Sequence, residues 1–138
     1  MASTLTLSIV TPERELVRVQ ADEVELPGTE GYFGVLPGHT PLLATLTVGR
    51  LTYRVGQERH VLAIATGLAE VLPDRVTVLS QIAELPEDID ISRAESARRR
   101  AEERLSRNEG DLDYARARTA LDKAMLRLQV ASRSRASR

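Results

Sequence analysis

The sequence predicts an α+β protein, with an N-terminal antiparallel β-sandwich followed by a hairpin of two antiparallel helices. Two observations carry this prediction. Up to residue 85, apolar and polar residues alternate in short runs, and turn residues interrupt them about every 8–12 positions, as in sandwiches and barrels. After Pro86, apolar residues recur every three or four positions, which is typical of amphipathic helices. We therefore expect a β domain over 1–85 and a helical domain over 86–138.

The first domain is expected to hold eight or nine short strands. Turns are expected at Gly56-Gln57, Thr66-Gly67 and Pro73-Asp74, because glycine and proline punctuate the alternation there. The segment 42–48, LLATLTV, has no charged residue and is predicted to be a buried strand. The apolar residues place the strands at 4–9, 16–19, 24–26, 32–36, 42–48, 51–55, 61–65, 68–72 and 76–79.

The glycine-rich stretch from Gly28 to Gly49 is the most distinctive part of this domain. Glycines recur there every three or four residues, which suggests successive bends in which φ is positive. Pro37-Gly38 predicts a tight turn, and His39 beside it is interpreted as a hydrogen-bonded anchor of the loop. A phosphate-binding loop would need a following helix and usually a lysine, and neither is present. We therefore interpret the stretch as a structural or partner-facing loop.

Two helices are expected in the second domain. Asp90 and Asp111 are suited to cap their N-termini, because a carboxylate accepts the free backbone N–H groups of a first turn. Asn108–Gly110 separates the helices, and the basic tail from Ser132 onward is expected to fray. The predicted apolar faces consist of Ile91, Ala94, Ala97, Ala101 and Leu105 in the first helix and Leu112, Ala115, Ala120, Ala124, Leu128 and Ala131 in the second.

The seam between these helices is mostly alanine. Each alanine in place of leucine forgoes about three buried carbons, at about 0.8 kcal/mol each, so the helices are expected to bind each other weakly. Two interpretations follow from this pattern: a hairpin that opens, or a hairpin that stays docked.

Composition and charge exclude several classes of protein. The chain has no cysteine and two histidines, His39 and His60, which lie apart; no metal site and no catalytic triad can be built from such spacing. No apolar run is long enough for a membrane span, and the N-terminus does not resemble a targeting peptide. A net charge of −1 argues against a nucleic-acid surface. The range 114–138, however, holds seven basic residues and one acidic residue, which favours an acidic partner.

Three motifs resemble the epsilon subunits of rotary ATP synthases. The first and most specific is GYFGVLPGHTPLL over 31–43; the second is TGLAEV over 66–71 with VTVL over 76–79; the third is IDISRA over 89–94, which is similar to the pattern I-D-x-x-R-A of that family. They occur in the family's order and the resemblance covers essentially the whole chain. It implies a ten-stranded β-sandwich with two C-terminal helices.

The resemblance also implies a non-catalytic role at the foot of the central stalk of a proton-translocating F-type ATP synthase. The sandwich would hold the gamma subunit and the c-ring, with Gly31, Gly34, Gly38 and His39 in a docking loop. The hairpin would inhibit ATP hydrolysis by extending beside gamma, where basic residues such as Arg116 and Arg118 would meet an acidic segment of the catalytic beta subunit. The expected location is the cytoplasmic face of a bacterial plasma membrane, with which the chain would associate only through the complex. A plastid thylakoid is the less favoured alternative.

The same resemblance implies a nucleotide site, with ATP as a regulatory ligand and no cofactor required. Lys123 replaces an arginine of the best ATP-binding members, so a lower affinity is expected, because lysine offers phosphate a point charge rather than a planar fork. A solvated helix face is the plain alternative for these residues, and a free-standing nucleotide-sensing module is the alternative function. The matching positions are Glu84, Asp90, Arg93, Ala94, Arg100, Lys123 and Arg127.

Overall fold

The computed structural model describes residues 4–107 and 111–136. The chain divides into two compact units, Met1–Glu84 and Leu85–Arg138. This division lies one residue before the boundary expected from Pro86.

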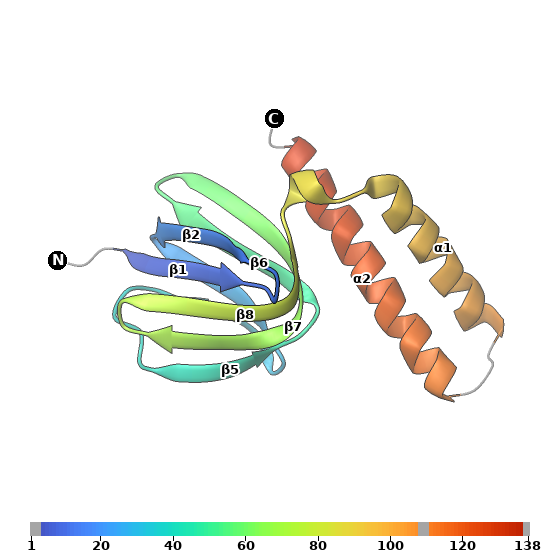
Figure 1. Cartoon of the computed structure of the whole chain (residues 1–138), viewed down its shortest axis with the longest axis horizontal. Coiled ribbons are helices and arrows are strands. Elements are labelled where there is room, and N and C mark those ends of the chain that lie inside the picture. The colour runs from blue at the N-terminus through green and yellow to red at the C-terminus, as the bar shows by residue number, and fades with distance from the viewer. Residues whose placement is uncertain (1–3, 108–110, 137–138) are drawn as a thin grey trace. The chain divides into compact units, whose positions relative to one another are not determined.

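The first unit is built from eight strands in two layers (Figure 1). Their order is β2-β1-β8-β7-β5-β3-β4, and β6 pairs with both β3 and β7. All pairs are antiparallel except β1 with β8, which run parallel, so the expectation of a wholly antiparallel sandwich needs this correction. The strands are β1 (Leu5–Val10), β2 (Glu15–Ala21), β3 (Glu23–Gly28), β4 (Gly31–Val35), β5 (Leu42–Leu46), β6 (Gly49–Val55), β7 (Glu58–Leu72) and β8 (Arg75–Glu84).

The long strand β7 connects the two layers. Its first half pairs with β6, and its second half lies between β5 and β8. The prediction of a turn between two strands at Thr66-Gly67 is wrong, because β7 continues through these residues with its register to β8 unchanged. The eight strands of the described residues are therefore fewer than the ten that the family resemblance implied.

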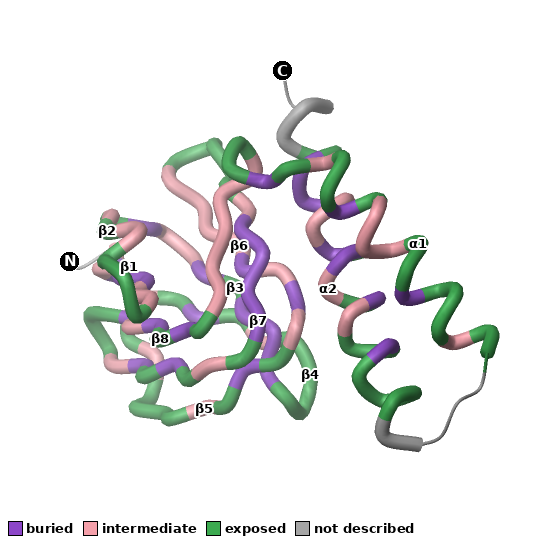
Figure 2. Tube along the Cα trace, turned by 45° about the vertical axis from the view of Figure 1, so that its right-hand side comes forward, coloured by how far each residue is buried: buried purple, intermediate pink, exposed green. Residues whose placement is uncertain are grey.

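The core of this unit follows the alternation of the sequence. Leu5, Leu7 and Ile9 of β1 are completely buried, as expected when every second residue faces inward. Figure 2 shows buried residues interspersed with exposed ones along the strands. The other large side chains that are fully buried are Val24, Leu26, Val35, Leu51, Leu62, Ile64, Val71, Val76 and Val78.

The second unit is a helical hairpin. A short 3-10 turn, η1 (Pro86–Asp88), precedes α1 (Ile91–Arg107) and α2 (Asp111–Ala136), which pack against each other in antiparallel fashion (Figure 1). Asp90 caps α1 as predicted, because its Oδ1 accepts the N–H of Arg93 at 3.1 Å. The helix α2 continues to Ala136, past Ser132, where the polar tail was expected to begin; the expected fraying itself stays a prediction. The break at 108–110 and the side chains of Asp111 and Leu112 lie outside the described residues.

The seam of the hairpin is rich in alanine, but its face on α2 differs from the prediction. Ala94 and Ala101 are buried on α1, and Ala117 and Ala124 are buried on α2 at the same spacing of seven residues. Ala115, which was expected in the seam, is exposed. Alanine occurs on several sides of α2, so spacing alone allowed two neighbouring stripes, and packing selected the one that contains Leu121.

Candidate functional site

The loop between β4 and β5 is fixed by backbone hydrogen bonds. Gly38 has φ of 87°, a left-handed conformation that glycine adopts without steric cost. Its N–H donates to the carbonyl of Pro73 at 2.7 Å, and the N–H of His39 donates to the carbonyl of Leu36 at 3.2 Å. The first bond holds the loop against the turn between β7 and β8. The loop is therefore attached to the β7–β8 turn at one end of the sandwich.

The glycines of this stretch have different roles. Gly31, with φ of 127°, and Gly38 take conformations reserved for glycine. Gly34 does not, because it pairs regularly with Glu25 in the ladder of β3 and β4, and a Cβ there would meet nothing within 4 Å. The prediction that Gly34 needs a positive φ is therefore wrong.

The two histidines occupy separate surfaces. The Nδ1 of His39 lies 2.6 Å from the carbonyl oxygen of Thr40, in keeping with an anchor inside the loop. His60 is exposed on β7, where its ring stacks on Tyr53 at 4.8 Å between centroids and its Nε2 lies 3.5 Å from Glu58. No group of three potential ligands for a metal ion occurs among residues 4–107 and 111–136.

Exposed leucines lie in the loop, in β5 and on β7 and β8, and sequence reasoning missed this exposure. Leu42 and Leu43 were predicted to be buried, yet they are 41% and 69% exposed. Leu36 in the loop is also exposed, as are Leu68 and Leu79 on the neighbouring strands. A strand pattern without charges cannot reveal this exposure, since it looks the same whether the covering surface belongs to this chain or to a partner.

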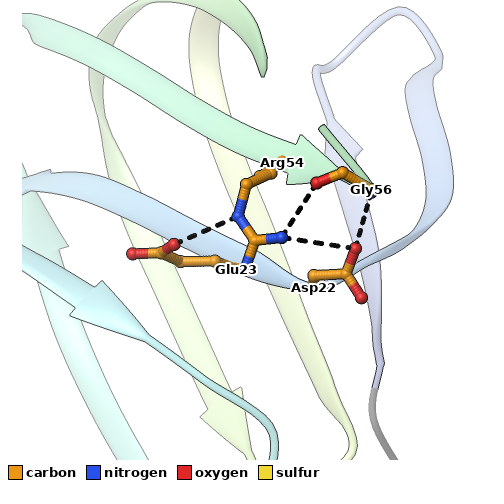
Figure 3. A network of polar contacts seen from close by, with 4 residues as sticks. All are labelled: Asp22, Glu23, Arg54 and Gly56. Carbon is orange, nitrogen blue, oxygen red and sulfur yellow. Dashed lines mark hydrogen bonds and ion pairs between the residues drawn. The ribbon is translucent and has the colours of Figure 1, made fainter. Parts of the chain in front are cut away.

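A polar network joins the β6–β7 turn to the start of β3 (Figure 3). The guanidinium of Arg54 lies 3.5 Å from Glu23 and 3.7 Å from Asp22, and donates to the carbonyl of Gly56 at 2.9 Å. The second partner of Asp22 is the N–H of Gly56, at 2.7 Å. These contacts tie the β6–β7 turn to the junction of β2 and β3, which suits a structural role.

The basic residues predicted to meet an acidic partner lie on α2. Arg116 and Arg118 are both exposed. Arg118 has an intrahelical partner, because its Nε lies 3.5 Å from Asp122. Arg116 and Lys123 instead border a hollow of about 440 Å³ over Ala115, Thr119 and Ala120. A cationic rim around small side chains is thus present on this face of α2.

The predicted nucleotide residues fall into three groups. Arg93 and Arg100 are exposed on α1, two turns apart, and Asp90 is occupied as the N-cap. Lys123 and Arg127 are half-buried, and they lie at and just past the middle of α2. The packing of η1 against α2 shows that the start of α1 lies beside α2.

The remaining two positions contribute differently. Ala94 is buried in the hairpin, so it can contribute only backbone and shape. Glu84 ends β8 in the other unit. Basic residues of this set therefore occur on both helices of the hairpin.

Comparisons with known proteins assign both units of the chain to one family. Residues 4–86 match the family model "ATP synthase, Delta/Epsilon chain, beta-sandwich domain", and residues 87–132 match "ATP synthase, Delta/Epsilon chain, long alpha-helix domain". The chain is 48% identical over 134 residues to the ATP synthase epsilon chain of Syntrophobacter fumaroxidans, covering 97% of this chain and all of that one. It is 43% identical to the epsilon chain of Halalkalibacterium halodurans, covering 94% and 98% of the two chains.

Solved structures show the same fold. A chain of the mitochondrial ATP synthase of Euglena gracilis superposes with a TM-score of 0.80 at 21% identity, covering 94% of this chain and 81% of that one. Neither helix of the described residues is long and apolar enough to cross a membrane.

Proposed function

Because the chain belongs to the epsilon chains of ATP synthase, we propose that it is the non-catalytic central-stalk subunit that couples the rotor of a proton-translocating F-type enzyme to its c-ring. The exposed leucines around the glycine loop carry the docking part of this proposal. An apolar surface of this kind on a small folded domain favours a protein partner. Within that complex the chain would lie at the cytoplasmic face of a bacterial membrane.

We infer that the surface around the β4–β5 loop binds gamma and the c-ring. Gly38→Val should prevent assembly, because a β-branched residue is disfavoured at φ of 87°. His39→Ala should assemble and leave the turnover of the complex nearly unchanged, since the ring contacts only the loop backbone in the described interactions. The test is co-purification with a complex stripped of this subunit; failure of the unaltered chain to rejoin that complex would refute the proposal.

The hairpin is proposed to inhibit ATP hydrolysis in an extended form. The 17 residues of α1 and the 26 residues of α2 span together about 65 Å at 1.5 Å per residue. Such a reach could bring Arg116 and its neighbours to an acidic segment of the beta subunit. The small side chains of the seam support this opening, because each contributes little buried area.

Deletion of 86–138 tests this role. Hydrolysis by the assembled complex should rise, while synthesis is retained. Replacing Arg116, Arg118, Lys123 and Arg127 by Ala should give part of the same gain, through loss of attraction to an acidic partner. Equal rates for intact and truncated complexes at low ATP and equal assembly would refute an inhibitory role.

ATP is proposed as the ligand of the closed hairpin. Arg93, Arg100, Lys123 and Arg127 supply positive charge on two adjacent helices, and phosphate is bound well by such groups. ATP should raise the free energy of unfolding of the isolated chain by RT ln(1 + [L]/Kd) and thereby raise its melting temperature. Arg127→Ala should reduce the shift and Lys123→Arg should increase it, because arginine binds phosphate bidentately. No shift at millimolar ATP would refute this site.

A further inference from the structure

The first arm of the hairpin, which comprises residues 86–107, buries few side chains. The structure describes every residue of this arm, and the buried ones are Ile89, Ala94 and Ala101. Among them, Ile89 is the one side chain larger than alanine, and it is 8% exposed. Because apolar stabilisation grows with the number of carbons removed from water, Ile89 contributes more to closing the hairpin than either buried alanine.

Ile89 lies at the open end of the hairpin, between two elements that pack on α2. The turn η1 precedes it and α1 follows it, and both elements contact α2. The N–H of Ile89 donates to the carbonyl of Pro86 at 3.3 Å, and the N–H of Asp88 donates to that of Leu85 at 3.0 Å. These bonds hold the segment that carries Ile89 as one compact turn beside α2.

The spacing of the seam alanines shows which part of α2 this turn faces. Buried alanines recur every seven residues on both helices, and Ala94 lies level with Ala124 in the antiparallel pair. One further step of seven residues leads from Ala124 to Ala131, which is also buried, and from Ala94 back into η1. The seam therefore continues past the start of α1, and η1 and Ile89 lie level with Ala131.

The contact between η1 and α2 is possible only in the closed hairpin. If α1 and α2 extended in line, Ala131 would lie about 60 Å from Ile91, because each helical residue adds 1.5 Å. Ile89 would then lose its cover on α2, whereas the hydrogen bonds within each helix would be kept. The burial of Ile89 therefore stabilises the closed form and not the extended one.

We propose that Ile89 is a latch that holds the hairpin closed and so limits the population of the extended, inhibitory form. The latch is a contact within this chain and needs no partner. For its effect on ATP hydrolysis the inference rests on the proposed function, whereas the closing of the hairpin does not depend on it. A group that is buried in one of two states shifts their populations toward that state, so truncation of Ile89 should favour the extended form.

Introduced thiols measure the opening directly, because the chain has no cysteine of its own. Ala124→Cys places a thiol in the seam and Ala69→Cys places one in the core of the sandwich, both at buried positions. In full-length chains, Ile89→Ala should raise the alkylation rate of the seam thiol about 10-fold or more, since three carbons of the latch are lost. The sandwich thiol should react at an unchanged rate.

Ile91→Ala is the matched control. It removes the same side chain two residues further on, where Ile91 is half-buried, and should accelerate alkylation of the seam thiol clearly less. Ile89→Val keeps most of the latch and should react nearly like the unaltered chain. No acceleration by Ile89→Ala, equal acceleration by Ile91→Ala, or equal acceleration at the sandwich thiol would overturn the latch. Thiols from Ala124→Cys and Ala117→Cys that both react freely with Ile89 in place would overturn it as well.

ATP hydrolysis separates the latch from the proposed function. Complexes assembled to an equal extent with the Ile89→Ala chain should hydrolyse ATP at low concentration more slowly than complexes with the unaltered chain, because more hairpins are extended. If the seam thiol becomes reactive but hydrolysis does not fall, the latch stands and the inhibitory role fails. If hydrolysis falls while the seam thiol stays protected, the inhibitory role stands and Ile89 is not the latch.

Discussion

The substitution Gly67→Ala should strongly destabilise the sandwich. The added Cβ would clash with the carbonyl oxygen of Leu79 and lie 3.0 Å from the Cα of Ser80. Ordinary contact begins at about 3.5 Å, so β8 would have to move by at least about 0.5 Å. Both obstacles are backbone atoms of a paired strand and cannot turn aside as a side chain can.

The cost follows from these contacts. Overpacking costs about 1–3 kcal/mol, and weakening one ladder hydrogen bond adds about 1 kcal/mol. Alanine also lowers the conformational entropy of the unfolded chain relative to glycine, which offsets about 0.4–1 kcal/mol of this loss. We therefore expect a net loss of about 1–3.6 kcal/mol, which is about 4–29 °C in Tm for a domain of this size.

Urea unfolding followed by far-UV circular dichroism measures this loss. Gly34→Ala is the matched control, because a Cβ there meets nothing within 4 Å and φ is not positive. It should change stability by less than about 0.5 kcal/mol or raise it slightly. A Gly67→Ala variant as stable as the unaltered chain, or equal losses at both glycines, would show that the strands are not this close.

Three further predictions concern polar groups. Arg54→Ala should cost about 1–2 kcal/mol, because it removes the bond to the Gly56 carbonyl and two ion pairs; Arg54→Lys should recover part of this in the same urea assay. Asp90→Ala should lower the stability of the hairpin by about 1 kcal/mol, whereas Asp90→Asn should preserve it; amide exchange at Arg93 would measure both. The hydrogen bond from Arg18 lowers the pKa of Glu15, so its small contribution is present at neutral pH and is lost as pH falls through the folded-state value. Arg18→Ala should raise the NMR titration midpoint of Glu15, and an unchanged midpoint would contradict the pairing.

The sequence by itself determined the class of the fold and the division of the chain. Alternation with period two required strands before residue 85, and spacing of three to four required helices after it. Asp90 was identifiable as a cap and Gly38 as a turn residue, because both depend on chemistry within a few neighbouring residues. The motif over 31–43 was sufficient to indicate the family.

Tertiary structure alone decided several other features. Thr66-Gly67 looks like a turn in isolation, and only the pairing with β8 and the hydroxyl of Ser80 keep it inside a strand. The uncharged segment around Leu43 predicts a core residue, and only the position of β5 on the sheet exposes its side chain. On α2, local spacing could not choose between Ala115 and Ala117, because both alanines fit a helix equally well and packing selected the buried one. Each of these outcomes depends on contacts between residues distant in sequence, which a pattern of neighbours does not contain.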